Sequence, residues 1–164
     1  INAFKLIDKN AGAKLTLSLI IDKDNLSSIS LNFLQTEIKG YNIVIKINVK
    51  NIKKLISDND CIVLPSYSEG MSRSLMEAAS LGRPIICSNI FGCKEMVRNN
   101  FNGFLVKPRS IESLANALKK FTKLSFMKKK ILSSNSRKII ENNFFDEKHV
   151  IKEYLNEIKN ESKE

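Results

Sequence analysis

Two carboxylates, Glu69 and Glu77, are separated by seven residues across a predicted loop-to-helix junction, and their spacing suggests a ligand site. Gly70, between them, allows the backbone to approach a ligand closely. Residues 72–74 (Ser-Arg-Ser) place free backbone N–H groups and a cation at the positive end of the helix. This arrangement predicts an anion site suited to a diphosphate. A carboxylate one or two turns further along can accept two hydroxyl hydrogen bonds, as from a ribose.

The same glutamates also have a purely local explanation. Ser74-x-x-Glu77 and Ser66-x-x-Glu69 both have the form of a capping box, in which the side chains satisfy the first N–H groups of a helix. On spacing alone, capping and ligand binding explain the pair equally well. The context favours ligand binding, because the junction directly follows a predicted strand and open α/β sheets bind ligands at the carboxyl ends of their strands.

The elements that position this junction alternate between strand and helix. Such alternation predicts an α/β fold with a Rossmann-like, doubly wound parallel sheet. Strands are predicted at 15–21, 41–47, 61–64, 84–88 and 103–106, and helices at 1–10, 25–39, 49–57, 72–81, 94–98 and 110–121. Gly12 and Gly40 are predicted to end the first two helices, Asn25 or Ser27 to cap the second, and Ser110 to cap the one at 110–121.

After residue 121 the pattern predicts helices alone, at 126–143 and 146–159. We therefore expect a single domain over residues 1–164, with a helical C-terminal tail over 122–164. The chain has 164 residues, 43% of them hydrophobic, which is enough for a substantial core and typical of a globular fold. It has no long apolar run, so neither a transmembrane helix nor a signal peptide is predicted. The three cysteines show no CxxC spacing, which favours a reduced, cytoplasmic setting.

The formal net charge of +10 suggests an anionic partner: nucleic acid, a membrane surface or a polyanionic small molecule. A lysine-rich, solvated surface explains the charge without a partner. No nucleic-acid-binding motif or interleaving of arginine with aromatic residues is present, so no nucleic-acid partner is expected. Lys128, Lys129 and Lys130 are predicted to form a solvated helix face that could also contact anionic lipid.

Two further features carry weaker alternatives. Asp22-Lys23-Asp24 follows a predicted strand and is similar to the metal-binding Asp-x-Asp of GT-A glycosyltransferases, but a polar turn is the better explanation of so short a motif. His149, the single histidine of the sequence, falls in the last predicted helix, far from the junction. A solvated or packing role is expected for it, and no metal site is predicted.

The segment Leu64–Ile86 resembles the donor-site signature of family-4 retaining glycosyltransferases of the GT-B fold. Residues 89–97 are similar to the family's "GG/GC-x-E-x-V" element, residues 102–106 to its "NGFLV" strand, and residues 60–65 to its "AD-x-x-VLPS" strand. The strong similarity covers about residues 51–107. Within the family, these motifs are most similar to those of bacterial enzymes that build capsule, O-antigen and lipid-linked oligosaccharides.

The resemblance implies that this chain is the C-terminal, sugar-nucleotide-binding domain of such an enzyme. Glu77 would accept the ribose hydroxyls, and Glu69 would be the catalytic-site residue beside the donor sugar. The other implied contacts are the backbone of Gly70, Met71 and Ser72 with sugar hydroxyls, Arg73 and the backbone near Ser74 and Leu75 with the diphosphate, and Ile47, Asn48 and Val49 with the base.

Some features of the family are absent from this sequence. The Arg and Lys that neutralise the diphosphate lie just after the family's first strand, and the sequence begins inside the helix that follows this strand. Asp22-Lys23-Asp24 replaces a Gly-Asp-Gly turn, and Ile47 replaces the glycine before the base loop. The catalytic histidine and the acceptor site belong to an N-terminal domain. We therefore expect a piece of a longer protein that does not catalyse transfer by itself.

The predicted function is donor binding in a glycosyltransferase that moves a sugar, with retention, from a nucleoside diphosphate sugar to a glycan or lipid-linked acceptor in surface polysaccharide synthesis. A UDP-sugar donor, no metal or other cofactor, and a cytoplasmic location at the inner face of the membrane are expected. The predicted partners are the donor, the missing N-terminal domain and a membrane or lipid-linked acceptor. A non-catalytic sugar-nucleotide-binding module and, more remotely, a basic nucleic-acid-binding protein remain as alternatives.

Overall fold

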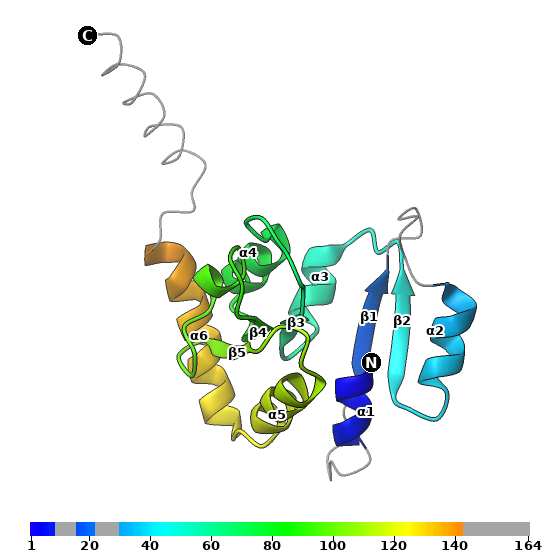
Figure 1. The fold of residues 1–164 in the computed structure, drawn as a ribbon. Coiled ribbons are helices and arrows are strands. Elements are labelled where there is room, and N and C mark those ends of the chain that lie inside the picture. Colours follow the sequence, from blue (N-terminus) through cyan, green and yellow to red (C-terminus); the bar gives the residue numbers. More distant parts are fainter. Residues whose placement is uncertain (9–15, 22–29, 143–164) are drawn as a thin grey trace, which may run out of the picture.

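A computed structural model describes residues 1–8, 16–21 and 30–142 of the chain. Strands and helices alternate along the described chain as predicted, and helices end it (Figure 1). In order, the elements are α1 (Asn2–Asp8), β1 (Leu17–Ile21), α2 (Leu31–Ile38), β2 (Ile43–Ile47), α3 (Ile52–Ser57), β3 (Ile62–Leu64), α4 (Arg73–Ser80), β4 (Ile85–Ser88), the 3₁₀ helix η1 (Lys94–Met96), β5 (Gly103–Val106), α5 (Ile111–Thr122) and α6 (Phe126–Asn142).

The helix starts show which polar side chains act as caps. The hydroxyl of Ser110 accepts a hydrogen bond from Ser113 N at 3.2 Å, which confirms this predicted cap. The predicted cap of α2 at Asn25 or Ser27 is wrong, because Ser30 has an extended backbone and accepts from Phe33 N. Asn51 caps α3 in the same way, so this helix begins three residues later than predicted.

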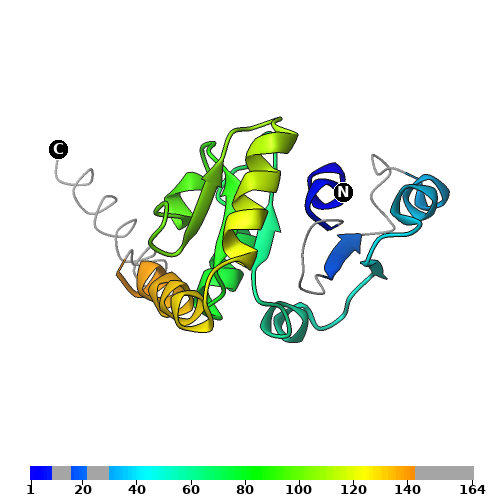
Figure 2. The same ribbon diagram turned by 90° about the horizontal axis from the view of Figure 1, so that it is seen from below.

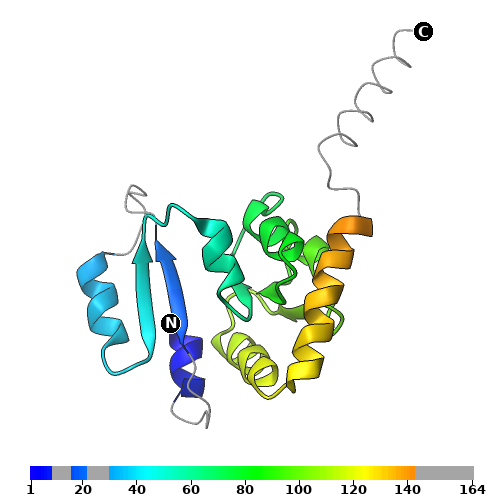
Figure 3. The same cartoon turned by 180° about the vertical axis from the view of Figure 1, so that it is seen from behind.

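All the paired strands run parallel, as the alternating pattern predicts. β1 pairs with β2 from Leu17–Ile43 to Ile21–Ile47, and β3, β4 and β5 form a second group in that order. Within the described residues the two groups share no strand pairing, and β1 and β3 each present an unpaired edge. Figure 3 shows the β1–β2 pair with α2 at one end of the molecule and α6 at the other.

The core is built on β4, whose four residues are all buried. Ile85 and Cys87 pack with α4 residues and Ile56 of α3 on one face, whereas Ile86 packs with Ala117 and Phe121 of α5 on the other. Figure 2 shows α1 and α5 on the side of the strands opposite α3. This cover on both faces confirms the doubly wound α/β architecture.

A third apolar cluster joins the two strand groups. Ala3, Phe4 and Ile7 of α1 pack with Ile43 of β2 and Ala115 of α5. The helix pair α1–α5 is therefore a bridge between the groups.

Several predicted features lie outside the described residues. These are the Gly12 cap, the turn Asp22-Lys23-Asp24, His149 and the helix at 146–159.

Candidate functional site

The loop that follows β3 carries Glu69 and is closed by a local hydrogen bond. The hydroxyl of Ser66 donates to Glu69 Oε1 at 3.0 Å. This bond joins two side chains within a loop, and no helix begins at Ser66, so the capping-box explanation of this pair is wrong. The bond leaves the other carboxylate oxygen of the half-buried Glu69 for a ligand. Gly70 and Met71 follow, both exposed, and a Cβ on Gly70 would meet nothing within 4 Å.

The start of α4 presents donors without partners. Ser72 is the N-cap and its side chain makes no capping bond; it lies 3.1 Å from the Ser74 hydroxyl instead. Ser72 N donates to Gly92 O, and Leu75 N donates to Ser72 O at 3.2 Å. Within the described residues, the N–H groups of Arg73 and Ser74 donate no hydrogen bond, so they are available to an anion.

Glu77 does not cap the helix. It is the fifth residue of α4, and Ser74 is already inside the helix, so the capping-box explanation of this pair is wrong. Its carboxylate has no hydrogen-bond or ion-pair partner among the described residues, and the residue is half-buried. A half-buried carboxylate without a partner is the group expected to accept hydrogen bonds from a ligand.

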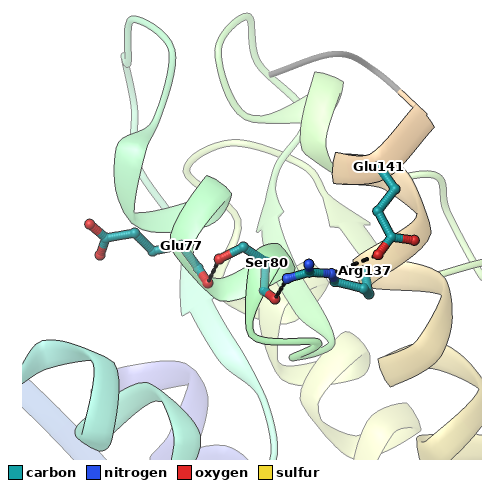
Figure 4. A network of polar contacts seen from close by, with 4 residues as sticks. All are labelled: Glu77, Ser80, Arg137 and Glu141. Carbon is teal, nitrogen blue, oxygen red and sulfur yellow. Dashed lines mark hydrogen bonds and ion pairs between the residues drawn. The ribbon is translucent and has the colours of Figure 1, made fainter. Parts of the chain in front are cut away.

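A network behind Glu77 attaches the end of α4 to α6 (Figure 4). The Ser80 hydroxyl donates to the Glu77 backbone oxygen at 2.9 Å, and Arg137 donates to Ser80 O and to Glu141 Oε1. In Figure 4 the Glu77 carboxylate points away from the Arg137 guanidinium. The cation therefore stabilises the helix end without neutralising Glu77.

A second loop, after β4, packs against the first. Gly92 has φ +80°, a backbone conformation suited to glycine, and its carbonyl accepts from Ser72 N at 3.2 Å. A Cβ built on Gly92 would overlap the carbonyl oxygen of Gly70. Only glycine therefore allows the loops to approach this closely. Gly92 was part of the recognised sequence pattern, but its role in supporting the site could not be read from the sequence.

The segment predicted to contact a base follows β2. Figure 1 shows the loop after β2 at the same end of the molecule as the loop that leads into α4. Ile47, which stands where the family has a glycine, is the last residue of β2, and the left-handed backbone of this segment falls on the next residue, Asn48, with φ +48°. Ile47 is 40% exposed and Val49 is half-buried, so this short segment offers apolar surface for a planar ring.

Sequence reasoning missed one cation near the site. Arg109, in the loop after β5, lies over the ring of Tyr67 with 5.1 Å from its guanidinium carbon to the ring centroid. The contact joins the loops after β3 and β5. The available signal was an arginine just beyond the predicted strand at 103–106.

The cysteines are not reactive groups of this site. Burial raises the pKa of the Cys87 thiol to about 12, with smaller contributions from Cys93 and Glu95, and burial also raises the pKa values of Cys61 and Cys93. All three thiols are free and stay protonated at neutral pH. Among the described side chains, no three His, Cys, Asp or Glu residues come together as a metal site. No helix in the described part is long and apolar enough to cross a membrane.

The fold and this loop-helix junction define a Rossmann-like α/β domain of the kind that forms the C-terminal half of GT-B glycosyltransferases. Residues 1–139 match the family described as Glycosyl transferases group 1, and the chain belongs to this family.

Named relatives agree with this assignment. The chain is 32% identical over 140 residues to the UDP-Gal:alpha-D-GlcNAc-diphosphoundecaprenol alpha-1,3-galactosyltransferase of Escherichia coli, covering 85% of this chain and 35% of that enzyme. It is 26% identical over 145 residues to the capsular polysaccharide biosynthesis glycosyltransferase CapM of Staphylococcus aureus, covering 88% and 37%. The crystal structure of Anabaena HepE in complex with UDP-glucose superposes with a TM-score of 0.75 at 21% identity, covering 87% of this chain and 40% of that one. The chain thus spans little more than a third of the length of these two curated relatives.

Proposed function

We propose that this chain binds the donor of a glycosyltransferase, a nucleoside diphosphate sugar with uridine as its base. The observation that carries the proposal is on α4: unbonded N–H groups at Arg73 and Ser74 lie one turn from the unpartnered carboxylate of Glu77. An anion at the helix start and hydroxyl groups at Glu77 satisfy both sets of groups at once. A diphosphate joined to a ribose has this chemistry.

The remaining contacts extend this arrangement along the donor. Glu69, with one carboxylate oxygen bonded to Ser66, is proposed to lie beside the sugar, next to the backbone N–H groups of Gly70 and Met71. Ile47, Asn48 and Val49 are proposed to lie against the base. Within the described residues, Ser72 N and Leu75 N are bonded to carbonyl oxygens, so we assign the diphosphate to Arg73 and Ser74 instead.

The chemistry proposed is electrostatic stabilisation of the departing diphosphate. The helix start concentrates about half a positive charge, and the exposed Arg73 adds a full one. Preorganised donors of this kind stabilise charge that develops in a transition state. On this basis we propose transfer with retention and without a metal ion or other cofactor.

The relatives support a role in surface polysaccharide synthesis. One acts on a diphosphoundecaprenol-linked sugar and another belongs to capsule synthesis, and HepE was crystallised with UDP-glucose. We propose a glycan or lipid-linked acceptor on the cytoplasmic side of a membrane. Because the chain spans little more than a third of these curated relatives, we propose that the acceptor site and the catalytic histidine come from a further, N-terminal domain.

The direct test is titration calorimetry of UDP with Glu77→Ala. Hydrogen bonds to a charged group contribute about 1.5–3 kcal/mol, so the dissociation constant should rise roughly tenfold or more. Glu112→Ala is the matched control, because it removes an identical side chain from the first turn of α5. Equal affinity of the parent and the Glu77 variant would refute the ribose assignment, and no binding of UDP, GDP or ADP by the parent would refute donor binding.

A further inference from the structure

The positive charge of this chain is concentrated in one stretch. Residues 113–140 contain eight Lys and Arg residues and no Asp or Glu, so they account for +8 of the net charge of +10. Glu112 and Glu141 flank this stretch on either side. An evenly distributed lysine-rich surface, as in the simplest explanation of the composition, does not produce this pattern. The charge therefore marks a particular surface, made by the end of α5 and by α6.

Large apolar side chains are exposed on the same surface. Phe126, Met127 and Ile131 of α6 are 77%, 63% and 55% exposed, and Met127 and Ile131 are one turn apart. The buried residues of α6, which include Leu132 and Ile139, lie on the other side of the helix and pack into the core. The outward side of α6 is thus apolar at the positions where a solvated helix would be polar.

The lysines around these apolar side chains are not neutralised. Lys123, Lys128 and Lys130 are exposed, and none forms an ion pair in the described part of the chain. Lys129, by contrast, lies over the Phe121 ring at 5.0 Å and belongs to the packed side. We call Lys123, Phe126, Met127, Lys128, Lys130 and Ile131 the α6 patch.

We propose that the α6 patch docks on a lipid bilayer with anionic headgroups. Exposed Phe, Met and Ile side chains beside unpaired lysines match a membrane interface, which takes apolar groups at the acyl boundary and cations at the headgroups. The contact proposed here is peripheral, made by the outward side of α6. Phe126 is the single aromatic ring of the patch, and the other two apolar side chains, Met127 and Ile131, offer no stacking surface for successive bases, so nucleic acid fits the patch less well.

The docking surface is separate from the donor site. The α6 patch lies at the start of α6, whereas the hydrogen bond from α6 to α4 is made by Arg137, near the other end of the helix. Figure 1 shows α6 along the side of the β3–β4–β5 group, away from β1 and β2. The inference therefore does not rest on donor binding, and loss of vesicle binding can be told apart from loss of UDP binding by measuring both on the same variants.

The experiment is sedimentation of the full chain with large vesicles of phosphatidylcholine alone or with about 30 mol% phosphatidylglycerol. Binding is expected only with the anionic lipid, and it should weaken as salt is raised. Lys128→Glu with Lys130→Glu should lower the partition coefficient by roughly tenfold or more. Met127→Ser with Ile131→Ser leaves the net charge unchanged and should lower it about threefold or more.

The matched control is Lys39→Glu with Lys53→Glu, which changes the net charge equally but at exposed lysines outside α5 and α6. It should bind anionic vesicles nearly as well as the parent. Circular dichroism and thermal unfolding establish that each variant is folded.

Three outcomes would overturn the proposal. The first is that the parent fails to bind anionic vesicles. The second is adsorption through net charge alone. It would be indicated if the control lost as much binding as the patch variant, or if the serine variant bound like the parent. The third is that single-stranded RNA binds to the patch and displaces the vesicles.

Discussion

At the residue scale, Gly92 is the position where one methyl group should have the largest effect on the site. A Cβ there overlaps the carbonyl oxygen of Gly70, so Gly92→Ala must separate the two loops that support the start of α4. We expect the dissociation constant for UDP to rise by roughly tenfold or more, because small displacements of positioning groups are costly. Calorimetry measures the affinity and thermal unfolding measures the stability.

Gly40→Ala provides the control for this change. Gly40 has φ +82°, nearly the same as Gly92, but a Cβ there meets nothing within 4 Å. Both variants carry the backbone strain of a left-handed alanine, about 1 kcal/mol, and only the Gly92 variant carries the overlap. Equal effects of the two on UDP affinity would show that the contact between the loops does not hold the site.

The buried thiol of Cys87 predicts a loss of stability at alkaline pH. Its pKa is raised from 9.0 to about 12 in the folded chain, mainly by burial. The folded state therefore keeps a proton that the unfolded state releases, and stability is retained below pH 9 and falls as the pH rises toward 12. The free energy of unfolding should fall by up to about 1.4 kcal/mol per pH unit in this window. Urea unfolding between pH 8 and 10.5 tests this, and Cys87→Ala should show a shallower decrease than the parent.

At the scale of elements, the sequence predicts which segments are helix or strand better than where they begin. The apolar period predicts the start of α6 at Phe126, where the structure has it, and Ser110 is a correct cap. The start of α2 was wrong because Asn25, Ser27 and Ser30 are all good capping residues, and only the extended backbone at Ser30 selects among them. For the same reason the spacing of Ser74 and Glu77 is compatible with a cap at Ser74. The extended backbone at Ser72 makes Ser72 the N-cap instead and places Ser74 inside α4.

Asn102 connects β5, the loop before it and α6, and its loss should destabilise the whole β3–β4–β5 unit. Its fully buried side-chain amide donates to Met96 O at 2.9 Å and accepts from Arg98 N at 2.8 Å, and its backbone carbonyl accepts from the Ser136 hydroxyl. Asn102→Ala leaves two backbone groups without these partners, so the free energy of unfolding should fall by about 2–4 kcal/mol. Urea unfolding measures this.

Asn99→Ala is the matched control for Asn102→Ala. Asn99 is exposed and accepts one longer bond, from Leu105 N at 3.3 Å. Its loss should cost less than about 1 kcal/mol. If the two variants were equally stable, the Asn102 network would not connect these elements.

At the scale of the whole molecule, the sequence was most informative about the ends of the strands. It predicted parallel strands and therefore a common edge for residues 47–49 and 66–77, and Figure 1 shows both loops at one end. It could not predict the contact between Gly92 and Gly70 or the Tyr67–Arg109 pair, because these join loops that are distant in sequence. It also could not show that the strands would form two groups, or that α1 and α5 would pack together and bridge them.

The division into two strand groups predicts unequal protection of the backbone from hydrogen exchange. β4 is paired on both sides, whereas β1 and β3 each have an unpaired edge in the described part of the chain. Amides of Leu17–Ile21 should therefore exchange at least about tenfold faster than those of Ile85–Ser88, since unpaired edges open locally at low cost.

We propose that a longer polypeptide supplies a strand between β1 and β3, as expected from the resemblance. In that protein β1 and β3 should become more protected, whereas β5, whose pairing with β4 does not change, should exchange as before. Exchange measured by mass spectrometry on both proteins tests this, and equal protection of β1 in the two would exclude a strand at that position.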